Sequence, residues 1–229
     1  MTRLRSQAGF TLPELLMAMS ISLMTMLAVL GVLDVSIKQT NAIAGRVNAT
    51  QRSRIVMDTI TRQLRSQVCY SATVPALVSA TDDTVRFHLD LGSGATQIEQ
   101  REIVFNATTK TIRERTWPGN GLTPLAFPTM TRDRLLIEDV VRRPAPEAAI
   151  FRYYAYNTLP TPRPDLLLPT PLNATDLARV AKIDIGFVTL PPGVKSTPLK
   201  PTAGSVTLQN EIYVRVADPN DPAPTPTCA

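Results

Sequence analysis

One uncharged apolar run near the N-terminus constrains this chain more than any other feature. The run Leu15–Leu33 contains no charged side chain and no proline. As an α-helix it spans roughly 28 Å, close to the hydrocarbon thickness of a bilayer. Backbone polar groups in lipid are satisfied only in helices or closed barrels, so the run predicts one membrane-spanning helix. Arg3 and Arg5 precede it, which predicts a cytoplasmic N-terminus and an extracytoplasmic remainder.

The residues next to this run argue against a plain anchor and against an ordinary signal peptide. Ala42-Ile43-Ala44 has the A-x-A pattern typical of signal cleavage sites, but it lies beyond the end of the apolar run. Glu14 stands at the head of the run. A carboxylate costs roughly 2.5–3.5 kcal/mol if it is carried to the membrane centre. An acid in this place therefore predicts a function, and a partner for its charge.

The stretch Gly9-Phe10-Thr11-Leu12-Pro13-Glu14-Leu15-Leu16 resembles the prepilin cleavage and methylation signature of the type IV filament family. In that family a short basic leader ends in glycine, a membrane aspartyl peptidase cuts after it, and the new N-terminal residue is methylated. The resemblance implies a leader of residues 1–9, cleavage between Gly9 and Phe10, and N-methylation of Phe10. It also implies that Glu14 pairs with the Phe10 amine of a neighbouring subunit. Such a pair gains more in a low-dielectric filament interior than in water, and it selects register.

Residues 34–70 predict an amphipathic continuation of the same helix. They contain no proline, and several apolar residues recur four apart. A break is left open only near Gly45. The predicted packing face comprises Ile43, Val47, Val56, Ile60, Leu64 and Val68, and the opposite face Arg46, Arg52, Arg54, Arg62 and Arg65. This basic face is solvated, contacts other subunits or binds DNA; the lack of interleaved aromatic residues weighs against DNA.

Residues 71–217 have the alternation typical of β-strands and predict an extracytoplasmic head. The expected strands are 84–91, 101–106, 111–117, 135–141, 149–156, 180–190 and 206–217. Residues 107–110 predict a hairpin and Asp82-Asp83 a turn, and most of the 20 prolines mark loops from Pro118 onward. Residues 218–229 form a proline-rich tail. The predicted fold class is α+β: a long N-terminal helix, with a membrane half at 10–33 and an amphipathic half at 34–70, packed on a mainly antiparallel β head.

Catalytic and metal-binding motifs are not found in the sequence. Cys69, Cys228 and the one histidine, His88, are too far apart to form a metal motif, so no metal, cofactor or enzymatic activity is predicted. His88 lies on the polar phase of its strand and is expected to be exposed. A disulfide between Cys69 and Cys228 and two unrelated free thiols are both open. Loop-entropy estimates give such a bond about 4–5 kcal/mol, and an extracytoplasmic compartment permits it.

The resemblance implies a minor pilin or pseudopilin of the bacterial inner membrane that initiates or caps a filament for secretion, adhesion, motility or DNA uptake. The order of elements in the head resembles the J-type subunit of type II secretion and the W-type minor pilins. The implied partners are other pilin or pseudopilin subunits, the prepilin peptidase and methyltransferase, an inner-membrane assembly platform and the lipid bilayer. Two alternatives stay open: a DNA-binding minor pilin of a competence system, and a membrane-tethered receptor or enzyme with an unrelated head.

Overall fold

The computed structural model describes residues 10–69, 75–90, 98–120, 126–157, 163–191 and 205–214. The chain forms two compact units, Met1–Ala44 and Gly45–Ala229. Its elements are α1 (Leu12–Arg65), β1 (Leu77–Ala80), β2 (Thr84–Leu89), β3 (Glu99–Asn106), β4 (Thr111–Pro118), β5 (Arg132–Ile137), β6 (Val140–Val141), β7 (Phe151–Ala155), β8 (Leu166–Leu167), α2 (Ala174–Arg179), β9 (Lys182–Thr189) and β10 (Val206–Tyr213).

The first unit consists, in its described part, of the N-terminal portion of α1. The helix begins because the Thr11 carbonyl accepts hydrogen bonds from the amides of Glu14 (3.0 Å) and Leu15 (3.1 Å). Pro13 falls in the first turn, where its missing N–H removes no helix bond. The helix continues without interruption through Gly31, and every described side chain up to Ala44 is exposed.

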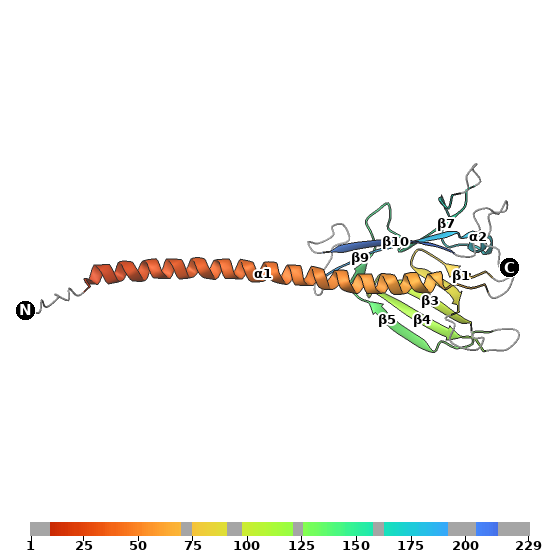
Figure 1. Ribbon diagram of the computed structural model, residues 1–229, viewed down its shortest axis with the longest axis horizontal. Coiled ribbons are helices and arrows are strands. Elements are labelled where there is room, and N and C mark those ends of the chain that lie inside the picture. The colour runs from red at the N-terminus through yellow and green to blue at the C-terminus, as the bar shows by residue number, and fades with distance from the viewer. Residues whose placement is uncertain are drawn as a thin grey trace, which may run out of the picture. The chain divides into compact units, whose positions relative to one another are not determined.

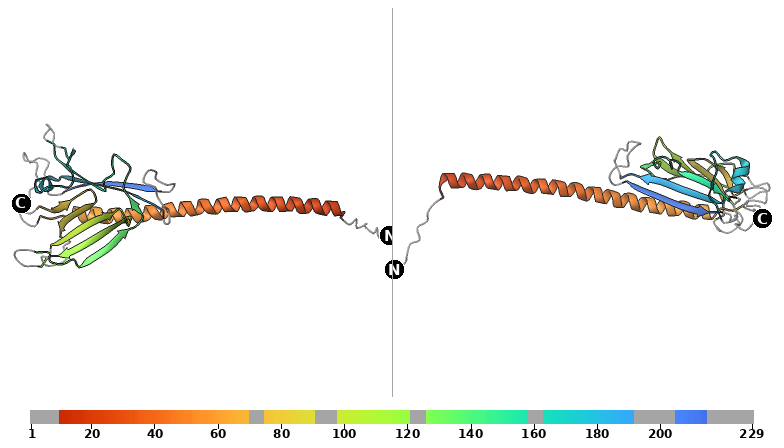
Figure 2. Two further views of the ribbon diagram at one scale, coloured as in Figure 1. Left: turned by 180° about the vertical axis from the view of Figure 1, so that it is seen from behind. Right: turned by 90° about the horizontal axis from the view of Figure 1, so that it is seen from above.

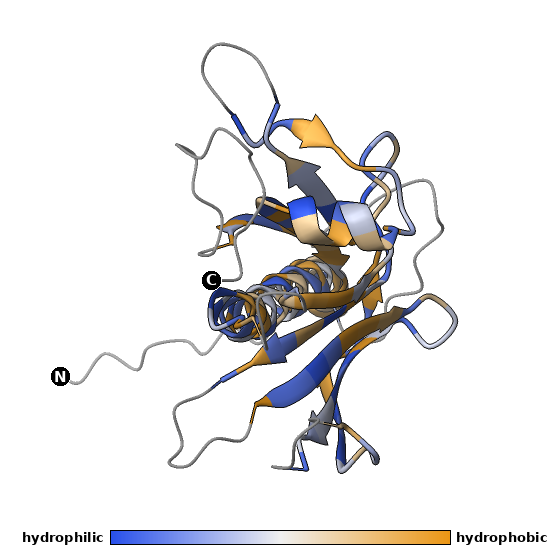
Figure 3. Ribbon diagram, turned by 90° about the vertical axis from the view of Figure 1, so that its right-hand side faces the viewer, coloured by the Kyte–Doolittle hydropathy of each residue, from blue (hydrophilic) through white to orange (hydrophobic). Residues whose placement is uncertain are grey.

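In the second unit α1 continues unbroken from Gly45 to Arg65 and packs between two antiparallel sheets. One sheet has the order β1-β2-β3-β4-β5; the other has the order β10-β9-β7-β8, with β6 also paired to β9. Figures 1 and 3 show strands of the two sheets on opposite sides of this part of α1. The buried residues of the helix are Ala49, Ser53, Val56, Met57, Ile60, Thr61, Gln63 and Leu64. The predicted α+β class, a long helix on a mainly antiparallel β head, is therefore confirmed.

The core between helix and sheets is mostly aliphatic, with a few rings. Its largest fully buried side chains include Tyr153, Phe87, Phe151, Phe187, Ile60 and Leu64. Two polar contacts join α1 to the second sheet. Ser53 Oγ and Thr189 Oγ1 are hydrogen-bonded at 2.7 Å, and Asn210 Nδ2 donates to Thr61 Oγ1 at 2.9 Å. These contacts fix the helix against β9 and β10 along its length in the head.

The predicted head strands correspond to observed strands, with three elements added. Strands β3 and β4 form the expected hairpin through residues 107–110, and Asp82-Asp83 forms the expected turn between β1 and β2. The predicted strand 135–141 is divided into β5 and β6 by a turn at Asp139, whose φ is 59°. Strands β1 and β8 and helix α2 were not predicted from the sequence. The predicted tail, 218–229, lies outside the described residues.

The predicted packing face of the helix is wrong at its start. Val56, Ile60 and Leu64 are buried, but Ile43 is 65% exposed and Val47 is 49% exposed. Val47 and Val56 are nine residues apart, which is about two and a half helical turns, so they lie on opposite sides of α1. Apolar residues recur every four positions before Val47 and after Val56, but the two sets lie on different faces of the helix.

The prediction that His88 is exposed is also wrong, because the residue is only 5% exposed. The ring centroids of His88 and Phe127 are 5.2 Å apart, and Nδ1 lies 3.4 Å from the Pro75 carbonyl oxygen. His88 and Leu177, which belongs to the unpredicted helix α2, line one pocket. Burial lowers the pKa of His88, although the bond to Pro75 opposes this shift.

Candidate functional site: the N-terminal segment of α1

The candidate site begins at the first turn of α1, where the chemistry predicted from sequence is concentrated. Phe10 precedes the helix by two residues, and Glu14 lies in its first turn. An acid there interacts favourably with the unsatisfied amides and the positive end of the helix dipole. Phe10 and Glu14 are exposed and four residues apart, about one turn along the chain. Gly9 lies outside the described residues, so the geometry of the predicted cleavage bond stays a prediction.

From this turn onward the helix is apolar on all sides. Large exposed apolar residues follow without a long gap from Leu12 to Ile37. In the described ranges, α1 is the one helix long and apolar enough to cross a membrane. A soluble monomer rarely exposes an apolar surface of this extent. The surface therefore requires lipid or other apolar helices around it.

The few polar side chains inside the apolar stretch are satisfied by the helix itself. Ser20 Oγ donates to the Met17 carbonyl at 2.8 Å, and Thr25 Oγ1 donates to the Ser22 carbonyl at 2.9 Å. These local bonds remove the need for water, which lipid does not supply. Charge returns only at Asp34 and Lys38, which form an exposed ion pair of 2.6 Å. Glu14 is thus the one charged side chain between the start of α1 and Asp34.

A scan against protein-family models matches residues 4–30 to the prokaryotic N-terminal methylation motif. The segment is a prepilin-type methylation motif. The match includes Arg5, the Gly9–Phe10 junction, Glu14 and the apolar run as far as Leu30. The motif implies a type IV pilin or pseudopilin subunit that is processed by prepilin peptidase and assembles with other pilins. A search of curated proteins found no match to the chain.

The predicted arginine face of α1 is not a continuous free basic surface. Arg46 and Arg54 are exposed, but Arg62 Nη2 binds Asp58 Oδ2 at 2.5 Å. Arg52 is half-buried beside β5, with Nη1 4.0 Å from Glu138 Oε1. One arginine is thus neutralised and another is turned into the head. This arrangement further weakens the alternative of a DNA-binding helix face.

Of the two cysteines in the predicted disulfide, only Cys69 lies within the described residues. Cys69 has a bonded partner and is not free. Cys228 lies outside the described residues, so the bond between the two stays a prediction. Within the described ranges, no group of three or more histidine, cysteine, aspartate or glutamate side chains could hold a metal ion.

The head contains a buried charge cluster that was not predicted from the sequence. Asp184 on β9 is 1% exposed, and its Oδ2 accepts from Arg152 Nε at 3.0 Å and from Gln209 Nε2 at 3.3 Å. Arg143 is 4% exposed, and it donates to Asp184 Oδ2 at 3.4 Å and to Glu147 Oε2 at 2.8 Å. The cluster ties the segment between β6 and β7 to the second sheet. The sequence signal is an acid, Asp184, flanked by Ile183 and Ile185 in the strand.

Proposed function

We propose that this protein is a minor pilin or pseudopilin that initiates or caps a type IV-class filament. The chain inserts in the bacterial inner membrane, is cleaved after Gly9, is N-methylated at Phe10 and then assembles with other pilins. The observation that carries the proposal is the motif match over residues 4–30, joined to an exposed apolar helix that has a single acid, Glu14, at its head.

The helix supplies both the anchor and the assembly element. In the bilayer, lipid covers the apolar surface of α1; in a filament, helices of neighbouring subunits cover it instead. The positive-inside tendency of Arg3 and Arg5 supports a cytoplasmic N-terminus and an extracytoplasmic head. Transfer from lipid to filament therefore keeps apolar surface away from water. Among charged groups, this transfer mainly changes the surroundings of Glu14 and the new N-terminal amine.

Glu14 supplies selectivity for the correct register. An unpaired carboxylate inside lipid or a helix bundle is costly, and an opposite charge at close range removes much of that cost. The methylated Phe10 amine of a neighbouring subunit carries this opposite charge. Only a stagger that brings the two groups together satisfies both, so the pair rejects other registers more than it adds stability.

The head supports a minor rather than a major position. It contains two five-stranded sheets with long connections, which is more structure than packing around a central helix requires. Such a head suits a subunit used in few copies at a filament end, where it does not repeat along the shaft. The order of its elements resembles the J-type subunit of type II secretion and the W-type minor pilins, and the inner-membrane assembly platform is the implied partner there.

The test compares two acid-to-alanine variants at opposite ends of the apolar stretch. Glu14→Ala removes the proposed assembly charge, while Asp34→Ala is the matched control at the other end. Filaments are sheared from cells that express an epitope-tagged chain, and membrane and filament fractions are immunoblotted. Both variants should be processed and present in the membrane, and only Glu14→Ala should be lost from the filaments. Incorporation of Glu14→Ala at the wild-type level would contradict the proposal.

A further inference from the structure

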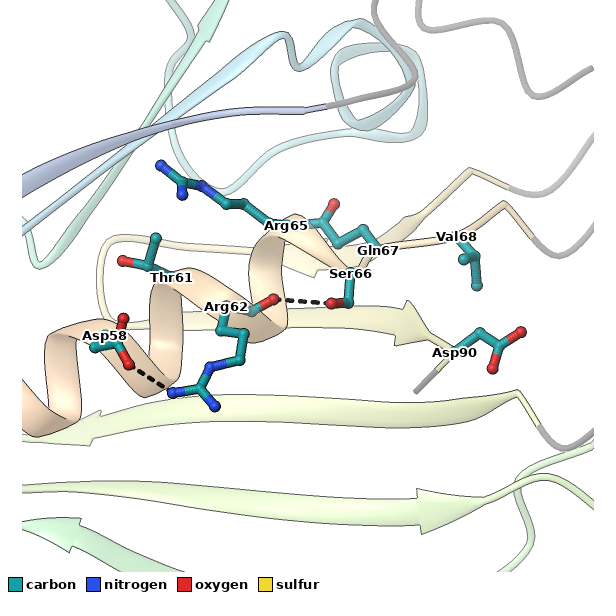
Figure 4. A pocket seen from close by; sticks show the side chains of 8 residues that line it. All are labelled: Asp58, Thr61, Arg62, Arg65, Ser66, Gln67, Val68 and Asp90. Carbon is teal, nitrogen blue, oxygen red and sulfur yellow. Dashed lines mark hydrogen bonds and ion pairs between the residues drawn. The ribbon is translucent and has the colours of Figure 1, made fainter. Parts of the chain in front are cut away.

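The end of α1 borders a cleft in the head that is lined by the side chains of Gln67 and Arg65. The cleft has a volume of about 460 Å³ and lies between the last turns of the helix, the residues that follow it and Asp90, the residue after β2. Figure 4 shows the Arg62 guanidinium turned toward Asp58, whereas the Arg65 side chain points in another direction. The cleft is separate from the apolar N-terminal surface to which the motif belongs.

Gln67 is the first sign that the cleft takes a ligand. The residue is 7% exposed, and neither its Oε1 nor its Nε2 has a hydrogen-bond partner in the structure. A buried side-chain amide without partners is unfavourable and uncommon. Its two atoms offer one acceptor and one donor group, which match the N–H and C=O of an extended polypeptide.

Arg65 indicates the charge of the ligand. The neighbouring Arg62 is neutralised by Asp58 at 2.5 Å, but Arg65 makes no ion pair with any described residue. The carboxylate of Asp58 is matched by Arg62 and Asp90 has an interaction of its own, so the side chain left to bind a charged ligand is Arg65. A carboxylate is the natural partner of a guanidinium, because it can accept two parallel hydrogen bonds. Together the two side chains select an extended polypeptide with an acidic residue.

The direction of β10 brings one such segment to the cleft. Val206 pairs with Thr189, which bonds Ser53, and four residues later Asn210 bonds Thr61. The strand thus advances along α1 toward its C-terminal end, and Figures 1 and 2 both show β10 alongside this part of the helix. The chain beyond Val214 therefore starts near the cleft.

The composition of residues 215–229 matches what the cleft lacks. The segment contains Asp218 and Asp221, two carboxylates to pair with Arg65, and it contains Cys228. Cys69 directly follows the cleft residues and is not free, and Cys228 is the only other cysteine of the sequence. A Cys69–Cys228 bond would hold the segment beside the cleft.

We infer that the cleft at the end of α1 is the docking site for the chain's own segment 215–229. Asp218 or Asp221 accepts hydrogen bonds from Arg65, and the segment's backbone bonds the Gln67 amide. The disulfide forms when Cys69 and Cys228 lose two protons and two electrons to a disulfide-donating oxidant of the extracytoplasmic compartment.

A zero-length cross-link tests the docking directly. The Arg65→Lys variant of the full chain, purified in detergent without reductant, places an amine in the cleft that carbodiimide couples to a carboxylate in contact. Mass spectrometry should find position 65 joined to Asp218 or Asp221. The matched control is Arg54→Lys, an exposed α1 position outside the cleft, and it should give no such product.

Two further measurements separate the remaining explanations. In an equal mixture of isotope-labelled and unlabelled chains, the cross-link should stay within one chain; a link between chains would mean that a second copy fills the cleft. With Cys69→Ser and Cys228→Ser added, the yield should remain above about half of its original value. A fall to the Arg54→Lys level, or no coupling in the Arg65→Lys variant, would overturn the inference.

Discussion

Gly186→Ala is expected to destabilise the head through the guanidinium of Arg143. A Cβ at Gly186 would lie 2.3 Å from both Cζ and Nε of Arg143 and 2.8 Å from its Nη1. These distances are far below van der Waals contact, and Arg143 is buried, so its side chain must leave its position. Its hydrogen bonds to Glu147 (2.8 Å) and Asp184 (3.4 Å) are then lost.

The size of the destabilisation depends on which hydrogen-bond partners Asp184 retains once Arg143 is displaced. Removal of one partner of a buried ion pair costs about 3–5 kcal/mol when the other charge is left uncompensated. Asp184 still has Arg152 and Gln209, so the loss falls below that range. The bond to Glu147 adds little because that carboxylate is 43% exposed. The bond to buried Asp184 contributes about 1.5–3 kcal/mol, and the substitution of glycine restores about 0.4–1 kcal/mol through the unfolded chain. The expected net destabilisation is about 2 kcal/mol.

Urea unfolding of the full chain in detergent, followed by the fluorescence of Trp117, measures this change. The decisive control is a double-mutant cycle with Arg143→Ala. Once the arginine side chain is absent, Gly186→Ala has nothing to displace and should cost less than about 0.5 kcal/mol. Equal destabilisation in both backgrounds would refute the reasoning, as would wild-type stability of the Gly186→Ala single variant.

Three further predictions concern the head. Replacement of Cys69 and Cys228 by serine should lower the free energy of unfolding by about 4–5 kcal/mol, and unchanged urea midpoints would disprove the bond. Burial lowers the pKa of His88, so the unfolded chain binds the proton more tightly. Stability should therefore fall as the pH drops below about 6.5, and urea midpoints over a pH series should show a shallower fall for His88→Gln. Thr61→Val removes the hydrogen bond to β10 and should cost about 1 kcal/mol in the same assay; Thr59→Val, which loses only a bond within the helix, should cost less.

The N-terminal methylation motif could be predicted because its pattern is local in sequence. An apolar run of bilayer length, a glycine–phenylalanine junction and one acid in fixed register need no tertiary context to be recognised. The structure adds that the hydroxyl groups of Ser20 and Thr25 donate hydrogen bonds to backbone carbonyls of the same helix. It also adds that the helix is continuous through Gly31 and Gly45.

The head could be predicted only as far as its alternation patterns reach. Strand positions follow from period-two patterning, but which face is covered depends on distant segments. His88 is buried because Phe127 and α2 lie over its side of the sheet. Asp184 occupies the outward phase of β9, and Arg143, 41 residues earlier in the chain, is what covers it. These contacts are set by tertiary placement of loops, which local patterns do not encode.

The mature N-terminus tests the central claim most directly. The protein is purified from its native membrane, and its N-terminal peptide is analysed by mass spectrometry. We expect a chain that starts at N-methylated Phe10, with residues 1–9 removed. A chain that starts at Met1 or Thr2 would reduce the segment to an ordinary membrane anchor. A start at Gly45 would make it a secretory signal, and either result would contradict the assignment as a pilin-type subunit.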